Sequence, residues 1–193
     1  MEACVKNGVK RFIHTSALEA VYGPDLKAYI FNEKNWAETS GKDSYSTSKI
    51  DAEKAVWELY EYYKDQLEIV SLVPATVIGP FLSKDYIGST CRAIRRFLLG
   101  DLFYIPEMTI PLCTIEDLCQ AYYLALFNDK AVGERIIICN DSLWYEELFD
   151  ILRAHKTNHE DVEKYTKKLP TVKNPEMFLK GLGFMSKYIG GLH

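Results

Sequence analysis

The first part of the chain carries two short apolar runs that predict buried strands. Residues 9–15 form the first run, and Gly8 before it suits the left-handed turn that ends a helix over residues 1–7. Residues 67–73 form the second run, which is almost continuously apolar. Such a run is typical of a strand that is covered on both faces.

A long amphipathic stretch separates the two runs. In residues 44–63 the apolar side chains recur at helical spacing, which predicts a half-buried helix. Its charged positions are expected on the solvent face: Asp51, Glu53, Lys54 and Glu58. Strand, helix and strand in this order predict a βαβ unit with parallel pairing.

The rest of the chain continues as mixed helices and strands. We expect strands at residues 102–105, 109–114 and 135–139, and helices at residues 86–99, 115–127, 143–155 and 175–189. Residues 17–43 are polar and predict a long loop, and loops of this length are often functional. The fold class expected is α/β, with a partial, Rossmann-like, doubly wound parallel sheet and a small second lobe.

Composition excludes several classes of function. The net charge is -4 with interspersed signs, so the chain offers no basic field for nucleic acid. Its five cysteines contain no C-x-x-C pair, which argues against a disulfide framework and a metal site. No apolar run is long enough to cross a bilayer, and the expected location is the cytoplasm.

Two tyrosine–lysine pairs stand one helical turn apart, Tyr45 with Lys49 and Tyr60 with Lys64. A nearby cation favours ionisation of a phenol, so such a pair can exchange a proton near neutral pH. In a chain with 13 tyrosines, about one such spacing is expected by chance. The position of each pair in the fold must therefore distinguish a functional pair from a chance one. Tyr45 opens its helix, next to the carboxyl end of the first strand, where open α/β sheets bind ligands. Tyr60 lies several turns away and is expected to pack.

Three ordered segments carry a resemblance to a known family. They are HTSALEAVYG at residues 14–23, YSTSKIDAEKAVW at residues 45–57 and LVPATVIGP at residues 72–80. Together they resemble successive landmarks of the extended short-chain dehydrogenase/reductases, in the NAD-dependent epimerase/dehydratase superfamily. The chain is most similar to the branch of dihydroflavonol reductase, cinnamoyl-CoA reductase and 3-beta-hydroxysteroid dehydrogenase.

The resemblance implies a catalytic set of Ser16, Tyr45 and Lys49. Tyr45 would exchange a proton with the substrate oxygen, and Lys49 would lower its pKa and bond the nicotinamide ribose. Ser16 would donate a hydrogen bond to the substrate oxygen, with Thr15 as the alternative. The cofactor implied is NAD(P), with NADP preferred. Its expected contacts are Thr15, Tyr45, Lys49, Pro74, Ala75, Thr76 and Val77.

The resemblance also implies a division of the chain. Residues 1–80 would be the C-terminal half of the Rossmann-like domain, and residues 81–193 mainly a substrate-binding lobe with segments that return to the sheet. The substrate expected is a medium-sized carbonyl or alcohol with an apolar body. Its pocket would use side chains of the segment after Pro80: Phe81, Tyr86, Phe97, Leu98, Phe103 and Tyr104.

The family's N-terminal Gly-x-x-Gly-x-x-Gly turn is not matched, so the chain is expected to be N-terminally truncated. The leading interpretation is a fragment of an NAD(P)-dependent oxidoreductase. A sugar-nucleotide epimerase or dehydratase, and a truncated non-catalytic paralogue that binds a partner, stay open as alternatives. A strand left without its inner neighbour predicts self-association through the exposed sheet edge.

Overall fold

The computed structural model describes residues 1–22, 30–80, 83, 88–155 and 160–173. The chain divides into two compact units. The first comprises Met1–Val77 and Cys113–Cys139, and the second comprises Ile78–Leu112 and Asn140–His193. Among the helices in the described ranges, none has the length and apolar character needed to cross a membrane.

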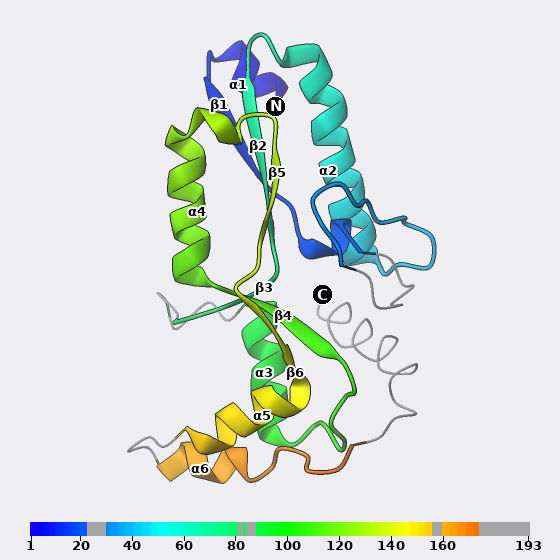
Figure 1. Ribbon diagram of the computed structural model, residues 1–193, viewed down its shortest axis with the longest axis vertical. Coiled ribbons are helices and arrows are strands. Elements are labelled where there is room, and N and C mark those ends of the chain that lie inside the picture. The colour runs from blue at the N-terminus through cyan, green and yellow to red at the C-terminus, as the bar shows by residue number, and fades with distance from the viewer. Residues whose placement is uncertain (23–29, 81–82, 84–87, 156–159, 174–193) are drawn as a thin grey trace. The chain divides into compact units, whose positions relative to one another are not determined.

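A parallel sheet forms the centre of the first unit (Figure 1). Its strands are β1 (Arg11–Thr15), β2 (Glu68–Pro74) and β5 (Arg135–Ile138), in the order β1-β2-β5. In the register, Ile13 pairs with Val70 and Leu72 pairs with Ile136. The central strand β2 is buried along nearly its whole length, which explains its continuous apolar sequence. The predicted parallel βαβ unit is therefore confirmed.

Two long helices cover the faces of this sheet. Helix α2 (Ser44–Tyr63) and helix α4 (Ile115–Phe127) lie on either side of the strands in Figure 1, and both have the predicted bounds. Val70 and Leu72 of β2 pack toward Ala125 of α4, whereas Ser71 between them bonds to α2. Alternate residues of a strand point to opposite faces, so β2 serves both helices.

Shorter elements complete the first unit. Helix α1 (Glu2–Lys6) precedes β1, and Gly8 between them has the expected left-handed backbone with φ 67°. The predicted loop over residues 17–43 contains the 3₁₀ helix η1 (Leu18–Ala20), and its residues 23–29 lie outside the described ranges. A second 3₁₀ helix, η2 (Asp129–Ala131), leads into β5.

The second unit is built around an aromatic cluster. Phe97 of α3 (Ser89–Leu99) meets Tyr145 and Phe149 of α5 (Tyr145–Ala154), with all three ring centroids 5.9 Å apart. Edge-to-face contacts of this kind stabilise a core beyond the area they bury. Helix α6 (Glu160–Thr166), which the sequence pattern did not predict, packs near α3 and α5.

A second sheet has the strand order β3-β4-β6, with β3 at Thr76–Ile78, β4 at Thr109–Thr114 and β6 at Asp141–Trp144. Thr109 to Leu112 pair antiparallel with β6. The helix predicted over residues 143–155 therefore begins later, at Tyr145, because the preceding residues complete this pairing. The amide of Trp144 donates to Glu147 Oε2 at 2.8 Å and helps to cap the helix.

The strand predicted at residues 102–105 is wrong. Leu102 and Ile105 are both buried in the aromatic cluster, although a strand would place residues three apart on opposite faces. Of residues 102–105, only Ile105 forms a β-bridge to another described residue, Lys173. The helix predicted at residues 175–189 lies outside the described residues.

Candidate active site

Tyr45 is presented by the first turn of α2. Asp43 caps this helix: its Oδ1 accepts from the amides of Tyr45 and Ser46 at 2.9 and 3.0 Å, and its Oδ2 accepts from Ser46 Oγ at 2.9 Å. The cap fixes the backbone that carries the tyrosine. The Tyr45 side chain remains 43% exposed, so its hydroxyl can meet a ligand.

Lys49 joins Tyr45 to the end of the first strand. Its Nζ lies 6.0 Å from the centre of the Tyr45 ring and donates to the carbonyl oxygen of Thr15 at 3.3 Å. Thr15 is the last residue of β1, at the carboxyl edge of the parallel sheet. The structure therefore brings Tyr45 and Lys49 together at the sheet edge where α/β proteins bind their ligands.

The electrostatic surroundings of Tyr45 differ from the expectation that Lys49 lowers its pKa. Burial raises the pKa of Tyr45, and the charges of Glu19 and Asp43 raise it further. The pKa of Glu19 is itself raised, mainly by burial. In the protein alone Tyr45 is thus held as a neutral phenol at neutral pH.

Ser16 occupies a different environment from Tyr45 and Lys49. It is only 2% exposed, and its Oγ donates to Glu53 Oε2 at 2.6 Å. Its amide donates to the carbonyl of Leu72 at 2.8 Å, within the β1–β2 pairing. To reach a substrate oxygen, as the resemblance implies, the hydroxyl would have to leave a buried carboxylate.

Glu53 corrects the expectation that it lies on the solvent face of α2. Its exposed fraction is 0%, and its carboxylate accepts from Ser16, from Ser71 Oγ at 2.7 Å and from Arg135 Nε at 2.8 Å. Burial raises the pKa of Glu53, but the hydrogen bonds from Arg135, Ser16 and Ser71 outweigh burial and the pKa is lowered overall. A carboxylate is tolerated at this position because Arg135 neutralises it.

The remaining predicted cofactor residues lie at the ends of β1 and β2. The Thr15 side chain is exposed, and its Oγ1 forms a hydrogen bond with the hydroxyl of Tyr122. Pro74 and Ala75 are buried, and the Ala75 amide donates to the carbonyl of Ile138 at 3.0 Å. Thr76 and Val77 follow in β3 and are partly exposed. Their predicted role toward a cofactor stays a prediction.

The second tyrosine–lysine pair has a different setting. Tyr60 packs edge-on against Trp57, with ring centroids 5.7 Å apart. Lys64 forms an ion pair with Glu61 at 3.0 Å on the exposed end of the helix. This agrees with the expectation that Tyr60 is a packing residue and that position distinguishes the two pairs.

The apolar residues expected to line a substrate pocket are divided in the structure. Phe97 is buried in the aromatic cluster of the second unit, whereas Phe103 is 81% and Tyr104 39% exposed. Phe81 and Tyr86 lie outside the described residues. Phe97 is thus a core residue rather than a lining residue.

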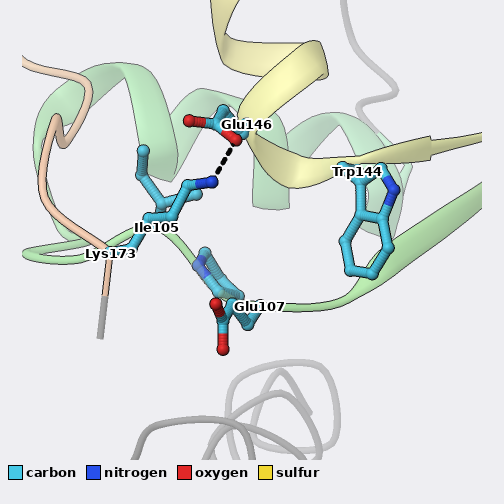
Figure 2. A pocket seen from close by; sticks show the side chains of 6 residues that line it. Ile105, Glu107, Trp144, Glu146 and Lys173 are labelled. Atoms are coloured by element: carbon cyan, nitrogen blue, oxygen red, sulfur yellow. Dashed lines mark ion pairs between the residues drawn. The ribbon is translucent and has the colours of Figure 1, made fainter. Parts of the chain in front are cut away.

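The second unit has an open pocket of about 230 Å³, shown in Figure 2. Its lining comprises Ile105, Pro106, Glu107, Trp144, Glu146 and Lys173. Lys173 and Glu146 form an ion pair across it, and Trp144 stands at its other end (Figure 2). None of these residues belongs to the predicted site.

Sequence reasoning missed Glu53 and Arg135 as members of the region around the site. One signal was present: Glu53 follows Lys49 by one helical turn and Ile50 by three residues, which places it on the buried stripe. Arg135 gives no comparable local signal, because its partner lies in a distant part of the chain.

The fold and the site together define an α/β protein with a tyrosine and a lysine at the carboxyl edge of a parallel sheet. Comparison with known proteins identifies the family within this class. The chain belongs to the NAD dependent epimerase/dehydratase family, which its sequence matches over residues 1–139.

Curated relatives include several reductases. The chain is 26% identical over 163 residues to the NADPH-dependent methylglyoxal reductase GRE2 of Saccharomyces cerevisiae, covering 76% of this chain and 48% of that protein. It is 25% identical over 199 residues to dihydroflavonol 4-reductase of Gerbera hybrida, covering 97% of this chain and 54% of that protein. The chain therefore spans about half the length of these relatives.

Solved structures of the same fold include both reductases and epimerases. Yeast methylglyoxal/isovaleraldehyde reductase Gre2 complexed with NADPH matches with a TM-score of 0.70 and 20% identity, over 98% of this chain and 68% of that chain. The UDP-glucose 4-epimerase of Thermus thermophilus complexed with NAD matches with a TM-score of 0.59 and 20% identity, over 100% of this chain and 68% of that chain. These likenesses establish the Rossmann-like fold predicted from the sequence.

Proposed function

We propose that this chain carries the proton-transfer part of an NADP-dependent oxidoreductase that acts on a carbonyl or secondary alcohol. The observation that supports this most strongly is the pairing of exposed Tyr45 with Lys49, whose Nζ reaches the carbonyl of Thr15 at the end of β1. Membership of an NAD-dependent family and relatives such as the methylglyoxal reductase support the same conclusion.

The residues near Tyr45 suit a nicotinamide nucleotide. The Lys49 ammonium would donate to the ribose hydroxyls, and Thr15 with residues 74–77 would border the nicotinamide at the ends of β1 and β2. When bound, the nicotinamide supplies or accepts the hydride. The preference for NADP rests on the relatives, one of which is named as NADPH-dependent.

Tyr45 would carry the proton at the substrate oxygen. The ordinary pKa of a phenol already lies well above neutral pH, and burial, Glu19 and Asp43 raise that of Tyr45 further, so the side chain is protonated and can donate. Carbonyl reduction requires this donation, and alcohol oxidation requires the reverse transfer. The protonated phenol is the form that carbonyl reduction requires, and Lys49 would stabilise the phenolate left after the transfer.

The substrate proposed is a small or medium-sized molecule with an apolar body. The second unit is proposed as the lobe that selects it, in line with the division at residue 80 expected from the sequence. Exposed Phe103 and Tyr104 are the described aromatic side chains of this segment that remain available to a ligand.

The test is a substrate panel on the complete gene product that contains this chain. Oxidation of NADPH by aromatic or alicyclic ketones, with slower oxidation of NADH, is the expected result. Interconversion of UDP-sugars with no net NADPH oxidation would favour the epimerase alternative. Quenching of tryptophan fluorescence by NADPH provides a separate measure of binding, and its absence with the complete protein would favour a non-catalytic partner-binding role.

A further inference from the structure

A buried charged cluster lies behind the Tyr45–Lys49 pair, on the same helix. Glu53 accepts five hydrogen bonds: from Ser16 Oγ at 2.6 Å, Ser71 Oγ at 2.7 Å, Arg135 Nε and Nη2 at 2.8 and 3.0 Å, and Trp57 Nε1 at 3.4 Å. The bidentate pairing with Arg135 fixes the carboxylate in direction as well as position.

Arg135 uses its remaining donors on the loop that precedes α2. Its Nη1 donates to the carbonyls of Glu33 and Asn35, both at 2.8 Å, and its Nη2 lies 3.4 Å from the carbonyl of Ala20. The guanidinium also lies 3.6 Å from the centre of the Trp36 ring, a cation–π distance. One side chain of β5 thus holds two separate segments of that loop.

Together these contacts form a clamp, defined here as Glu53, Arg135, Ser16 and Ser71. Through the clamp, α2 contacts the residue after β1, the middle of β2 and the start of β5. Arg135 also connects these elements to the loop before Tyr45. Glu53 follows Lys49 by one turn and Tyr45 by two turns on the same side of the helix. A fixed Glu53 therefore fixes the rotation and depth of the helix at the site.

The clamp contributes geometry more than stability. Replacing a buried ion pair by well-packed apolar side chains is often neutral or stabilising, so burial of Glu53 and Arg135 is not required for folding energy. An apolar contact, however, is non-directional and constrains the rotation of the helix less than a set of hydrogen bonds does. The hydrogen bonds of Glu53 are directional and require its partners on β2, on β5 and at the end of β1 to keep their positions.

From this geometry we infer that Glu53 is the positioning residue of the Tyr45–Lys49 site, acting through its buried pairing with Arg135, and that the Ser16 hydroxyl serves this clamp rather than the substrate. The inference rests on the proposed function of Tyr45 and Lys49. It gives Ser16 and Ser71 equivalent roles, because each donates one hydrogen bond to the same carboxylate.

The first experiment measures the pH dependence of kcat in the complete gene product with Glu53→Gln, Arg135→Gln and Glu58→Gln. Glu58→Gln is the matched control, since it makes the same chemical change at an exposed position of the same helix. Glu53→Gln and Arg135→Gln are expected to lower kcat by roughly 10- to 100-fold in folded protein. Both substitutions are expected to shift the pH profile of kcat in the same direction, because each removes part of the clamp that positions Tyr45.

Two results would overturn the inference. One is a folded Glu53→Gln variant with the kcat and pH profile of the parent protein. The other is displacement of the pH limb in opposite directions by Glu53→Gln and Arg135→Gln, since those variants change the buried charge in opposite senses. That pattern would show a simple charge effect on Tyr45.

Ser16→Ala and Ser71→Ala keep the test decisive where the charge variants fail to fold. Losses of kcat of similar size in both variants support the clamp. A large loss with Ser16→Ala and none with Ser71→Ala would show that Ser16 acts on the substrate, and would overturn the inference.

Hydrogen exchange separates this inference from the proposed function. If the parent protein shows no turnover with any substrate, the proposed function fails, but exchange of the amides of residues 44–52 still reports on the helix. The clamp predicts faster exchange there in Ser16→Ala and Ser71→Ala and no change in Glu58→Gln. Unchanged exchange in both serine variants would overturn the clamp.

Discussion

The surroundings of Tyr45 reinforce the neutral form of its phenol. It is partly exposed, yet burial of the remainder and the two carboxylates of Glu19 and Asp43 favour the neutral phenol. Lys49 is directed to the carbonyl of Thr15 rather than to the phenolic oxygen. In the protein alone Tyr45 is therefore a neutral phenol, which is the form that its proposed role as a proton donor requires.

Tyr45→Phe tests the proposed role of Tyr45 as a proton donor, because it removes only the phenolic hydroxyl. Removing the hydroxyl is expected to lower kcat by about 10²- to 10⁴-fold, the usual contribution of general acid–base catalysis. The affinity for NADPH, measured by fluorescence titration, is expected to change little because the ring is retained. Tyr60→Phe is the control, since Tyr60 packs on Trp57, and a comparable loss from it would show that the wrong pair had been chosen.

Glu19→Gln tests the origin of the raised pKa. The substitution keeps the size of the side chain and removes a negative charge that raises the pKa of Tyr45. The pKa of the phenol is expected to fall, so alcohol oxidation, which needs the phenolate, should reach its plateau at lower pH. A pH profile of kcat in the oxidising direction measures this, and an unchanged limb would contradict it.

At the scale of elements, the N-terminus of α2 links helix stability to the site. This N-terminus depends on the Asp43 cap, and the cap carries the backbone of Tyr45. Burial raises the pKa of Asp43, but its hydrogen bonds from Ser46 and Tyr45 outweigh burial, and the pKa is lowered overall. The ionised form of Asp43 therefore stabilises the folded state.

Asp43→Ala is expected to lower the free energy of unfolding by about 1 kcal/mol, the usual value of such a cap. The folded-state pKa of Asp43 is depressed, so its contribution is present above the ordinary value of 3.8 and is lost as the pH falls through the lower folded value. Urea unfolding of the parent and variant should therefore converge in acid. A constant difference at all pH values would contradict this assignment.

The elements also show which patterns are informative on their own. Helices α2 and α4 have the bounds predicted from periodicity, because helix period and caps are local features. The prediction of a strand at residues 102–105 was wrong because Leu102 and Ile105 are both buried in one aromatic cluster. Short apolar runs cannot distinguish a strand from a core-anchored loop.

At the scale of the molecule, the edge of the parallel sheet sets the behaviour of the chain alone. β1 stands at the end of the strand order β1-β2-β5. The Ser16 amide bonds toward β2, so by alternation the amides of Ile13 and Thr15 point to the other edge. Among the described residues the outer edge of β1 has no paired strand, and an open strand edge favours pairing with another chain.

The 193-residue chain expressed alone is therefore expected to self-associate with rising concentration in sedimentation or light scattering. Ile13→Pro removes an outward amide and is expected to increase the monomer fraction, since proline is tolerated on an edge strand. Phe127→Ala is the comparison, because its ring on α4 is 71% exposed and offers an alternative contact. Dissociation by Phe127→Ala alone, or a monomeric parent chain, would contradict an edge-mediated assembly.

Sequence patterns alone were enough to predict the βαβ order, the long helix and the place of Tyr45 and Lys49 at its start. These follow from hydrophobic period, turn residues and spacing within one helical turn, all of which act between near neighbours. The family resemblance extended this to the NAD-dependent epimerase/dehydratase superfamily, and the match over residues 1–139 confirms that membership.

The tertiary structure sets the environment of the charged and hydroxyl groups. It placed Glu53 in the core and directed Ser16 to it, because Arg135, distant in the chain, arrives on the neighbouring strand β5. It also surrounded Tyr45 with carboxylates from Glu19 and Asp43. Pairing of a buried charge depends on which segments meet in space, so the spacing that placed Glu53 on the buried stripe could not identify its partner Arg135.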